Sequence, residues 1–115
     1  MEDFHDCLKH QYAHVAIGEF KPGKLGEVQR LYEQAVATYG QGFKGAYLLR
    51  EAGSDRGISV IFWESIEDMD ANQSDGHEAI LKKMAPLFAQ NPTTAMYEVV
   101  SELEPQLQVL KSSSN

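Results

Sequence analysis

The run from Gly57 to Trp63, GISVIFW, limits more than any other feature how this chain can fold. β-Branched and aromatic residues dominate it, which is typical of a strand, and alternate side chains of a strand point to opposite faces of the sheet. One set of alternate residues is Ile58, Val60 and Phe62, and the other is Ser59, Ile61 and Trp63. Neither set is polar, so both faces of this strand must be covered.

The segments around this run alternate between strand and helix patterns. Strands are predicted at residues 11–20, 43–51 and 94–103, and the connection AGSDR predicts that 43–51 and 57–63 form an antiparallel hairpin. Residues 24–39 are predicted to form a helix because their apolar residues recur at steps of three and four. This apolar stripe consists of Leu25, Val28, Leu31, Tyr32, Ala35, Val36 and Tyr39.

A second helix is predicted over residues 66–88, in two parts. The S-x-x-D sequence at residues 65–68 has the spacing of a capping box, which predicts the first start. The pattern breaks near residues 73–76, and the D-x-x-E sequence at 75–78 predicts a second start with Asp75 as the cap. Pro86 should end or kink the second part, because proline cannot continue a helix.

The resulting β-α-β-β-α-β order predicts an α+β fold of the ferredoxin-like type, with one antiparallel sheet and both helices on one face. Residues 11–103 form this domain, between an N-terminal arm at 1–10 and a C-terminal arm at 104–115. Two helices cover only one face of the sheet, and the other face is also apolar. We therefore expect a homodimer that buries the second face against a second copy.

The charge of the chain excludes several classes of partner. The formal net charge is -7, from 10 basic and 17 acidic residues, and Lys82–Lys83 is the only adjacent basic pair. Nucleic acids and anionic membranes bind clustered Lys and Arg, so neither is expected as a partner. The N-terminus lacks the pattern of a signal peptide, and the single cysteine fits a reducing compartment. These features predict a cytoplasmic location.

Three stretches carry a resemblance to a known family: K-P-G at 21–23, G-F-K-G-A-Y-L-L-R-E at 42–51 and D-R-G-I-S-V-I-F-W-E-S-I-E-D at 55–68. Together they resemble the antibiotic-biosynthesis-monooxygenase (ABM-like) family of the dimeric α/β-barrel superfamily, over about residues 11–103. The resemblance implies a homodimer with a ligand pocket, in each subunit, between the sheet and its own helices. Family members catalyse different reactions, so the fold is implied more firmly than any one activity.

The function that the resemblance implies is a cofactor-independent monooxygenase acting on an aromatic or quinone-like compound. Haem-degrading relatives carry a tryptophan and an axial histidine on the second helix and an asparagine in the first strand. Those helix positions are Asn72 and Lys82 here, and the first strand has no asparagine, so haem degradation is not expected. Two alternatives stay open: a non-catalytic protein that binds a small ligand, and a structural dimer without a pocket.

His77 and Asn72 are the candidate catalytic residues, because both lie where the second helix breaks. A histidine can act as a general base, since its ordinary pKa is close to neutrality. The same position in a first helical turn also fits an exposed histidine without a role, and this is the favoured interpretation.

Trp63, His14 and Tyr47 are the candidate ligand-binding residues. Trp63 could form an aromatic wall of a pocket, although a buried structural tryptophan is the commoner case. His14 lies in the first strand and would border the pocket if it faced the helices. Tyr47 could donate its hydroxyl to a ligand, or it could be a packing residue.

The sequence also contains one pattern that invites a metal site. His5, Cys7 and His10 form H-x-C-x-x-H, but zinc sites use four ligands and no partner cluster exists elsewhere in the chain. No metal is therefore expected. The chain has no G-x-G-x-x-G, P-loop or G-x-S-x-G sequence.

Overall fold

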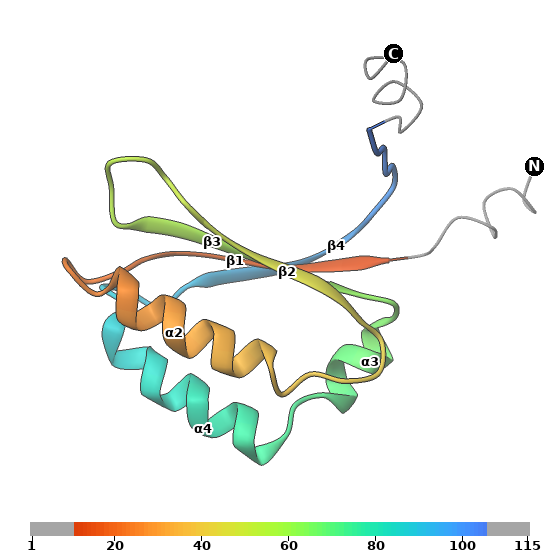
Figure 1. Ribbon diagram of the computed structural model, residues 1–115, viewed down its shortest axis with the longest axis horizontal. Helices are drawn as coiled ribbons and strands as arrows, with labels where there is room; N and C mark the ends of the chain where they lie inside the picture. The colour runs from red at the N-terminus through yellow and green to blue at the C-terminus, as the bar shows by residue number, and fades with distance from the viewer. Residues whose placement is uncertain (1–10, 106–115) are drawn as a thin grey trace, which may run out of the picture.

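The four strands form one antiparallel sheet in the order β2-β3-β1-β4, and the helices lie on one face of it (Figure 1). A computed structural model describes residues 11–105. The strands are β1 (Tyr12–Glu19), β2 (Phe43–Arg50), β3 (Arg56–Trp63) and β4 (Thr93–Glu98). The helices are α2 (Leu25–Val36), α3 (Ile66–Ala71), α4 (Asp75–Met84) and the short 3-10 turn η1 (Ala85–Leu87). The predicted ferredoxin-like fold is confirmed.

Helix α2 buries the stripe predicted for it, with Val28, Leu31, Tyr32 and Ala35 all buried against the sheet. The helix ends three residues before the predicted boundary. The Thr38 hydroxyl donates to the Ala35 carbonyl at 2.7 Å, and the Thr38 amide donates to the same oxygen. These tighter bonds close the last turn, as is common at helix ends.

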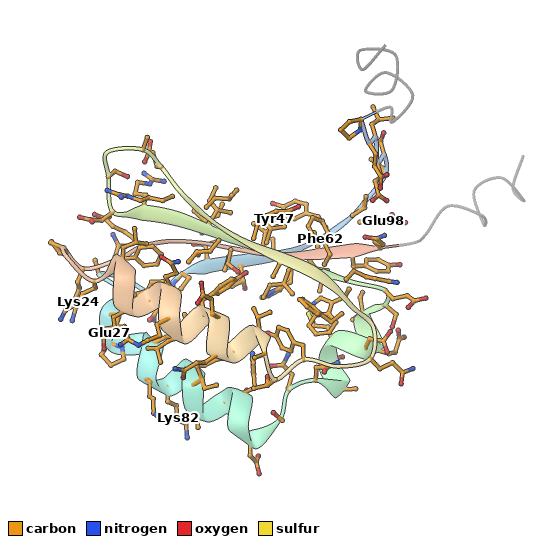
Figure 2. All side chains as sticks on the ribbon, in the orientation of Figure 1. Lys24, Glu27, Tyr47, Phe62, Lys82 and Glu98 are labelled. Carbon is orange, nitrogen blue, oxygen red and sulfur yellow. The ribbon has the colours of Figure 1, made fainter. Side chains whose placement is uncertain are left out.

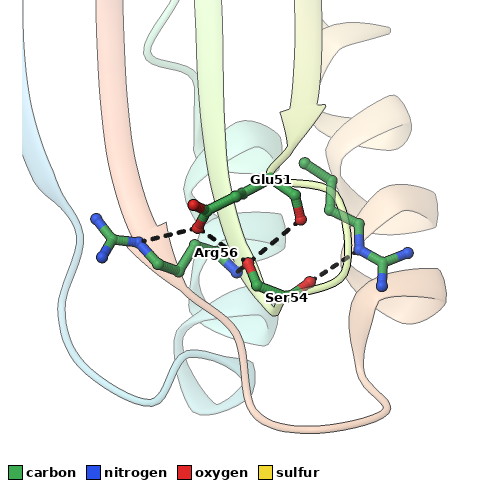
Figure 3. Close-up of polar contacts among 4 residues, drawn as sticks. Glu51, Ser54 and Arg56 are labelled. Atoms are coloured by element: carbon green, nitrogen blue, oxygen red, sulfur yellow. Dashed lines mark hydrogen bonds and ion pairs between the residues drawn. The ribbon is translucent and has the colours of Figure 1, made fainter.

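The hairpin between β2 and β3 is also as predicted. Ser54 organises its turn: the Ser54 hydroxyl donates to Glu51 Oε1 at 3.1 Å and accepts from the Arg56 amide at 3.0 Å (Figure 3). Arg50 Nε donates to the Ser54 carbonyl at 2.9 Å, and Arg56 Nε lies 3.7 Å from Glu51 Oε1.

The break in the second helix is confirmed, and its two caps are both serines. The Ser65 hydroxyl accepts from the Asp68 amide at 3.0 Å and donates to the Asp68 carboxylate at 2.9 Å. At the second start the prediction of Asp75 as the cap is wrong by one residue. The Ser74 hydroxyl accepts from the His77 amide at 3.1 Å, so Ser74 is the cap and Asp75 is the first helical residue.

Two predicted ends can be compared with the observed ones. Helix α4 ends at Met84, just before the turn that contains Pro86, as predicted. Strand β4 ends at Glu98, so the prediction of a strand to residue 103 is wrong. Its last residue, Glu98, pairs with Tyr12, which is the first residue of β1. One further bond follows, from the Val99 amide to the Gln11 carbonyl at 2.9 Å.

The two faces of the sheet differ in what covers them. Trp63 and Ile61 face the helices and are buried, 1% and 8% exposed, whereas Tyr47 and Leu49 on the opposite face are 62% and 48% exposed. Figure 2 shows Tyr47 and Phe62 on the side away from the helices. Among residues 11–105 no helix is both long enough and apolar enough to span a membrane.

Candidate functional site

A cavity of about 430 Å³ lies between the helices and the sheet, and we call it the central cavity. Its walls come from three strands (β1, β3 and β4), from α2, α3, α4 and η1, and from the segments that follow α2, α3 and η1. Most lining side chains are apolar or aromatic, and none of the described lining residues is Asp, Glu, Lys or Arg. A site of this size and character is suited to an uncharged small molecule.

Trp63 forms part of the wall of the central cavity while being almost fully buried. The Tyr39 ring packs edge-on against the indole with 4.7 Å between centroids, and Phe43 does so at 5.8 Å. Phe43 can face inward because the register between β2 and β3 shifts between Phe43 and Gly45. The two interpretations of Trp63, a packing residue and a pocket wall, are therefore compatible.

His77 also lines the central cavity and is 3% exposed, so the favoured expectation of an exposed residue is wrong. The physical reason is helical spacing. His77 precedes Ile80, Leu81 and Met84 by three, four and seven residues, which places it on the same stripe of α4 as these apolar side chains.

Tyr39 is the hydrogen-bond partner of His77. The Tyr39 hydroxyl lies 2.8 Å from His77 Nε2, and the two ring centroids are 5.1 Å apart. His77 Nδ1 is buried and, among residues 11–105, has no partner. An unpaired buried polar atom costs about 1–3 kcal/mol, so it calls for an explanation.

The burial of both rings keeps this pair uncharged at neutral pH. Burial lowers the pKa of His77, opposed by the nearby Glu78 carboxylate. Burial also raises the pKa of Tyr39 to about 12, with the neighbouring Tyr32 acting in the same direction. At pH 7 the phenol therefore keeps its proton and the imidazole is neutral.

His14 supplies a second imidazole to the central cavity from the middle of β1. Within the described part of the chain its side chain has no hydrogen-bond partner. Burial lowers the pKa of His14, so it too is uncharged at neutral pH.

Tyr32 and Ser59 form a second polar pair in the lining. The Ser59 hydroxyl donates to the Tyr32 hydroxyl at 3.1 Å, and the Tyr32 hydroxyl donates to the backbone carbonyl of Tyr47 at 3.0 Å. Burial raises the pKa of Tyr32, which the bond from Ser59 opposes. Because its proton is already engaged, Tyr32 is less available to a ligand than the histidines.

The structure does not bring the other two predicted residues to the central cavity. Asn72 holds backbone: its side-chain oxygen accepts from the Gly40 amide at 2.8 Å, and its Nδ2 donates to the carbonyls of Gln41 and Asp68 at 3.1 and 2.7 Å. Tyr47 lies on the outer face of the sheet, where its ring packs edge-on against Phe62 at 6.2 Å.

The sequence did not single out Tyr39, Tyr32 or Ser59 as site residues. Both tyrosines were predicted only as members of the apolar stripe of the first helix. The available signal was their hydroxyl groups, since a tyrosine on a buried stripe usually finds a polar partner. Nothing in the sequence indicated that the partner of Tyr39 would come from α4.

No metal site is found in the described residues, where no three of His, Cys, Asp and Glu are grouped so that they could hold an ion. His5, Cys7 and His10 lie outside the described residues.

Comparison with solved structures shows where this fold has been seen before. The chain matches a conserved protein from Methanosarcina mazei Go1 with a TM-score of 0.70 and 16% identity, over 77% of this chain and 92% of that one. It matches a candidate antibiotic biosynthesis monooxygenase from Bordetella bronchiseptica with a TM-score of 0.68 and 22% identity, over 80% and 99%.

A third match is a variant of SnoaB from Streptomyces nogalater, a cofactor-independent oxygenase, with a TM-score of 0.72 and 14% identity, over 83% of this chain and 98% of that one. At the level of sequence, no protein-family model and no curated protein matches. The chain therefore has the fold of antibiotic biosynthesis monooxygenase structures, and this relationship rests on structure.

Proposed function

We propose that this protein is a cofactor-independent monooxygenase that acts on an aromatic or quinone-like small molecule in the central cavity. One observation carries the proposal: a buried histidine, hydrogen-bonded to a tyrosine, lines a cavity whose described walls hold no charged side chain. A cavity lined by this pair and by the imidazole of His14 can take a proton from a ligand, stabilise the resulting anion and keep water away from it. The likeness in fold to an oxygenase supports the same direction.

The reaction needs no cofactor because the substrate supplies the electrons. A CH₂ group flanked by aromatic rings loses a proton to give a delocalised carbanion, which can reduce O₂ directly. One oxygen atom becomes a carbonyl oxygen on that carbon, and the other leaves as water with the two hydrogens. The protein has to remove the first proton and stabilise the anion.

Catalysis is favoured over simple binding by the pair of His77 and Tyr39. A binding protein needs apolar walls, but it does not need a buried imidazole whose second nitrogen is oriented by another side chain. The structural dimer without a pocket is disfavoured by the central cavity itself.

Oxygen consumption with a panel of anthrones that differ in their ring substituents tests the proposal. We expect at least one compound to be oxidised, with one atom of labelled O₂ in the product carbonyl. His77→Phe should lower kcat/KM by about 10²-fold or more, the usual effect of losing a proton-transfer or oxyanion-stabilising group. Lys82→Ala, on the exposed side of α4, is the control and should not change it. No oxidation above the uncatalysed rate across the panel would refute the proposal.

We also propose that the outer face of the sheet is covered by a second copy. Four large side chains there are 41–62% exposed: Ile17, Tyr47, Leu49 and Tyr97. Soluble monomers seldom leave so large an apolar face in water. Light scattering after gel filtration should give twice the chain mass, and Leu49→Glu should give monomers while Lys82→Glu does not. A monomeric wild type at tens of micromolar would contradict this.

A cytoplasmic location rests on the single cysteine and stays a prediction.

A further inference from the structure

The hydrogen bond between Tyr39 and His77 can be made in two ways. In the first, the Tyr39 hydroxyl donates to Nε2, and the single proton of the neutral imidazole is on Nδ1. In the second, Nε2–H donates to the phenol oxygen, and Nδ1 carries a lone pair. The choice decides whether His77 offers a ligand a donor or an acceptor.

Chemistry favours the first arrangement. A phenol is a stronger hydrogen-bond donor than a neutral imidazole N–H because it is the stronger acid, and an imidazole nitrogen is a stronger acceptor than a phenol oxygen. Among the described residues the Tyr39 hydroxyl has no other partner. In the second arrangement both the phenol hydrogen and the Nδ1 lone pair would be unpaired, whereas the first leaves one unpaired group.

The unpaired group in the first arrangement is Nδ1–H, a buried donor. Buried donors in folded proteins almost always have an acceptor, and one without a protein partner beside a cavity is suited to an acceptor on a ligand. His77 lies in the first turn of α4, where burial and the positive end of the helix dipole disfavour an imidazolium ion and outweigh the opposing Glu78 carboxylate. His77 is thus suited to donating a hydrogen bond rather than to carrying a transferred proton.

His14 has the complementary properties. It lines the same cavity from the opposite side, on the sheet, and in the described residues no donor or acceptor engages its ring. It lies in the middle of a strand, away from any helix N-terminus. A neutral imidazole that is free of protein partners can accept a proton through either nitrogen.

We propose that Tyr39 holds His77 in the Nδ1–H tautomer, that His77 donates a hydrogen bond to an oxygen atom of the ligand, and that His14 accepts the ligand's proton. Tyr39 is then a positioning residue. The existence of the reaction rests on the proposed function, but the tautomer of His77 does not.

The proton balance of the proposed oxidation fits this division. The substrate CH₂ gives a proton to His14, and the electron pair left on carbon forms the C–O bond with O₂. The resulting peroxide anion takes the proton back from His14, and loss of water leaves the carbonyl. His77 stays neutral and donates to the substrate oxygen over which the carbanion charge is delocalised.

The first test is NMR of the uniformly ¹⁵N-labelled full chain at pH 7.5, which distinguishes protonated from unprotonated imidazole nitrogens. We expect His77 to carry its proton on Nδ1 in the wild type and to shift towards Nε2–H in Tyr39→Phe. Tyr32→Phe, which removes the other cavity phenol with a hydrogen-bonded proton, is the matched control and should leave His77 unchanged. An Nε2–H tautomer in the wild type would overturn the assignment.

Two probe ligands test the roles towards a ligand. The carbonyl stretching frequency of bound 9-fluorenone should be lower in the wild type than in Tyr39→Phe, because a hydrogen bond from His77 weakens the C=O bond. Equal frequencies in the two proteins, or no binding of 9-fluorenone, count against the donor role of His77. Bound 1-naphthol should be at least tenfold more ionised in the wild type than in His14→Phe at the same pH. Equal ionisation overturns the role of His14.

These outcomes separate this inference from the proposed function. An Nδ1–H tautomer with no oxidation of any anthrone would refute the reaction and leave the hydrogen-bond assignment standing. Anthrone oxidation together with an Nε2–H tautomer would overturn the assignment alone.

Discussion

Replacing Gly42 by alanine tests how the chain holds Tyr39 and Phe43 against Trp63. Gly42 lies in the loop between these two aromatic residues and has a φ of +87°. A Cβ atom at this position would overlap the side chain of Asp68. The Gly42 carbonyl also accepts from the Glu64 amide at 2.8 Å, so the loop cannot move away from α3 without losing this bond.

The expected cost has two parts. The positive φ costs an alanine roughly 1–2 kcal/mol. The overlap includes the Cβ atom of Asp68, which a rotation of that side chain does not move, so the loop and the first turn of α3 must shift apart, for about 1–3 kcal/mol more. Gly42→Ala should therefore lower the free energy of unfolding by about 2–5 kcal/mol. Gly53 has a φ of +77° and open space around it, so Gly53→Ala should cost only roughly 1–2 kcal/mol.

Urea unfolding at 25 °C, followed by the fluorescence of the single tryptophan and by circular dichroism, measures both losses. Asp68→Gly, which removes every side-chain atom involved in the overlap, separates the two parts in a double-mutant cycle. In that background, Gly42→Ala should cost no more than Gly53→Ala does. Equal losses for the two glycine variants in the wild-type background would show that the overlap with Asp68 has no energetic consequence, and the reasoning would be refuted.

Three further predictions concern the site. Trp63→Ala should lower the free energy of unfolding by about 3–5 kcal/mol in urea titrations, because the indole is 1% exposed. Asn72→Ala should lower the free energy of unfolding by about 1–3 kcal/mol in the same measurement, since it removes three hydrogen bonds to backbone. Gln73→Ala is the control: it removes one exposed hydrogen bond and should lower that free energy by under about 1 kcal/mol. Lowering the pH from 6.5, the ordinary pKa of histidine, towards 5.5 should reduce the free energy of unfolding. Burial lowers the pKa of His77 and of His14 in the folded state, so the unfolded chain binds protons at a higher pH than the folded chain does. The loss is bounded by about 1.4 kcal/mol per pH unit for each histidine, and His77→Gln should reduce the slope; an unchanged slope would mean that His77 does not contribute.

The fold could be predicted because it depends on periodic patterns that short segments contain. The stripe from Leu25 to Val36, the hairpin connection before Arg56 and the serine-capped start after Ser65 are each local, and each is confirmed. The predicted helix ends differ from the observed ones where a side chain forms a hydrogen bond with the backbone that the apolar periodicity does not indicate. The Thr38 hydroxyl bonds to the Ala35 carbonyl and ends α2 early. The Ser74 hydroxyl accepts from the free His77 amide, so α4 is capped by Ser74, one residue before Asp75.

The site could be predicted only in part because it depends on contacts between distant segments. His77 and Tyr39 are 38 residues apart and meet because α2 and α4 lie side by side on the sheet (Figure 1). Asn72 follows the last residue of α3, five residues before His77, and its side-chain amide points to the loop after α2. The side of the sheet on which Tyr47 lies could not be predicted. The pairing register of β2 with β3 shifts between Phe43 and Gly45, and the sequence alone does not show this shift or, therefore, which residues of β2 face the helices.

The uncharged lining of the central cavity limits which anions it could stabilise. No lysine or arginine is among the described residues that line it, so a full opposite charge is not supplied there. A localised anion in such surroundings would be too costly, whereas an anion spread over aromatic rings needs less stabilisation at any one atom. A single hydrogen bond from His77, supported by the N-terminal end of α4, can then suffice. The same argument predicts that acids whose anions are localised, such as aliphatic alcohols and amines, are not deprotonated in this cavity even when they fit it.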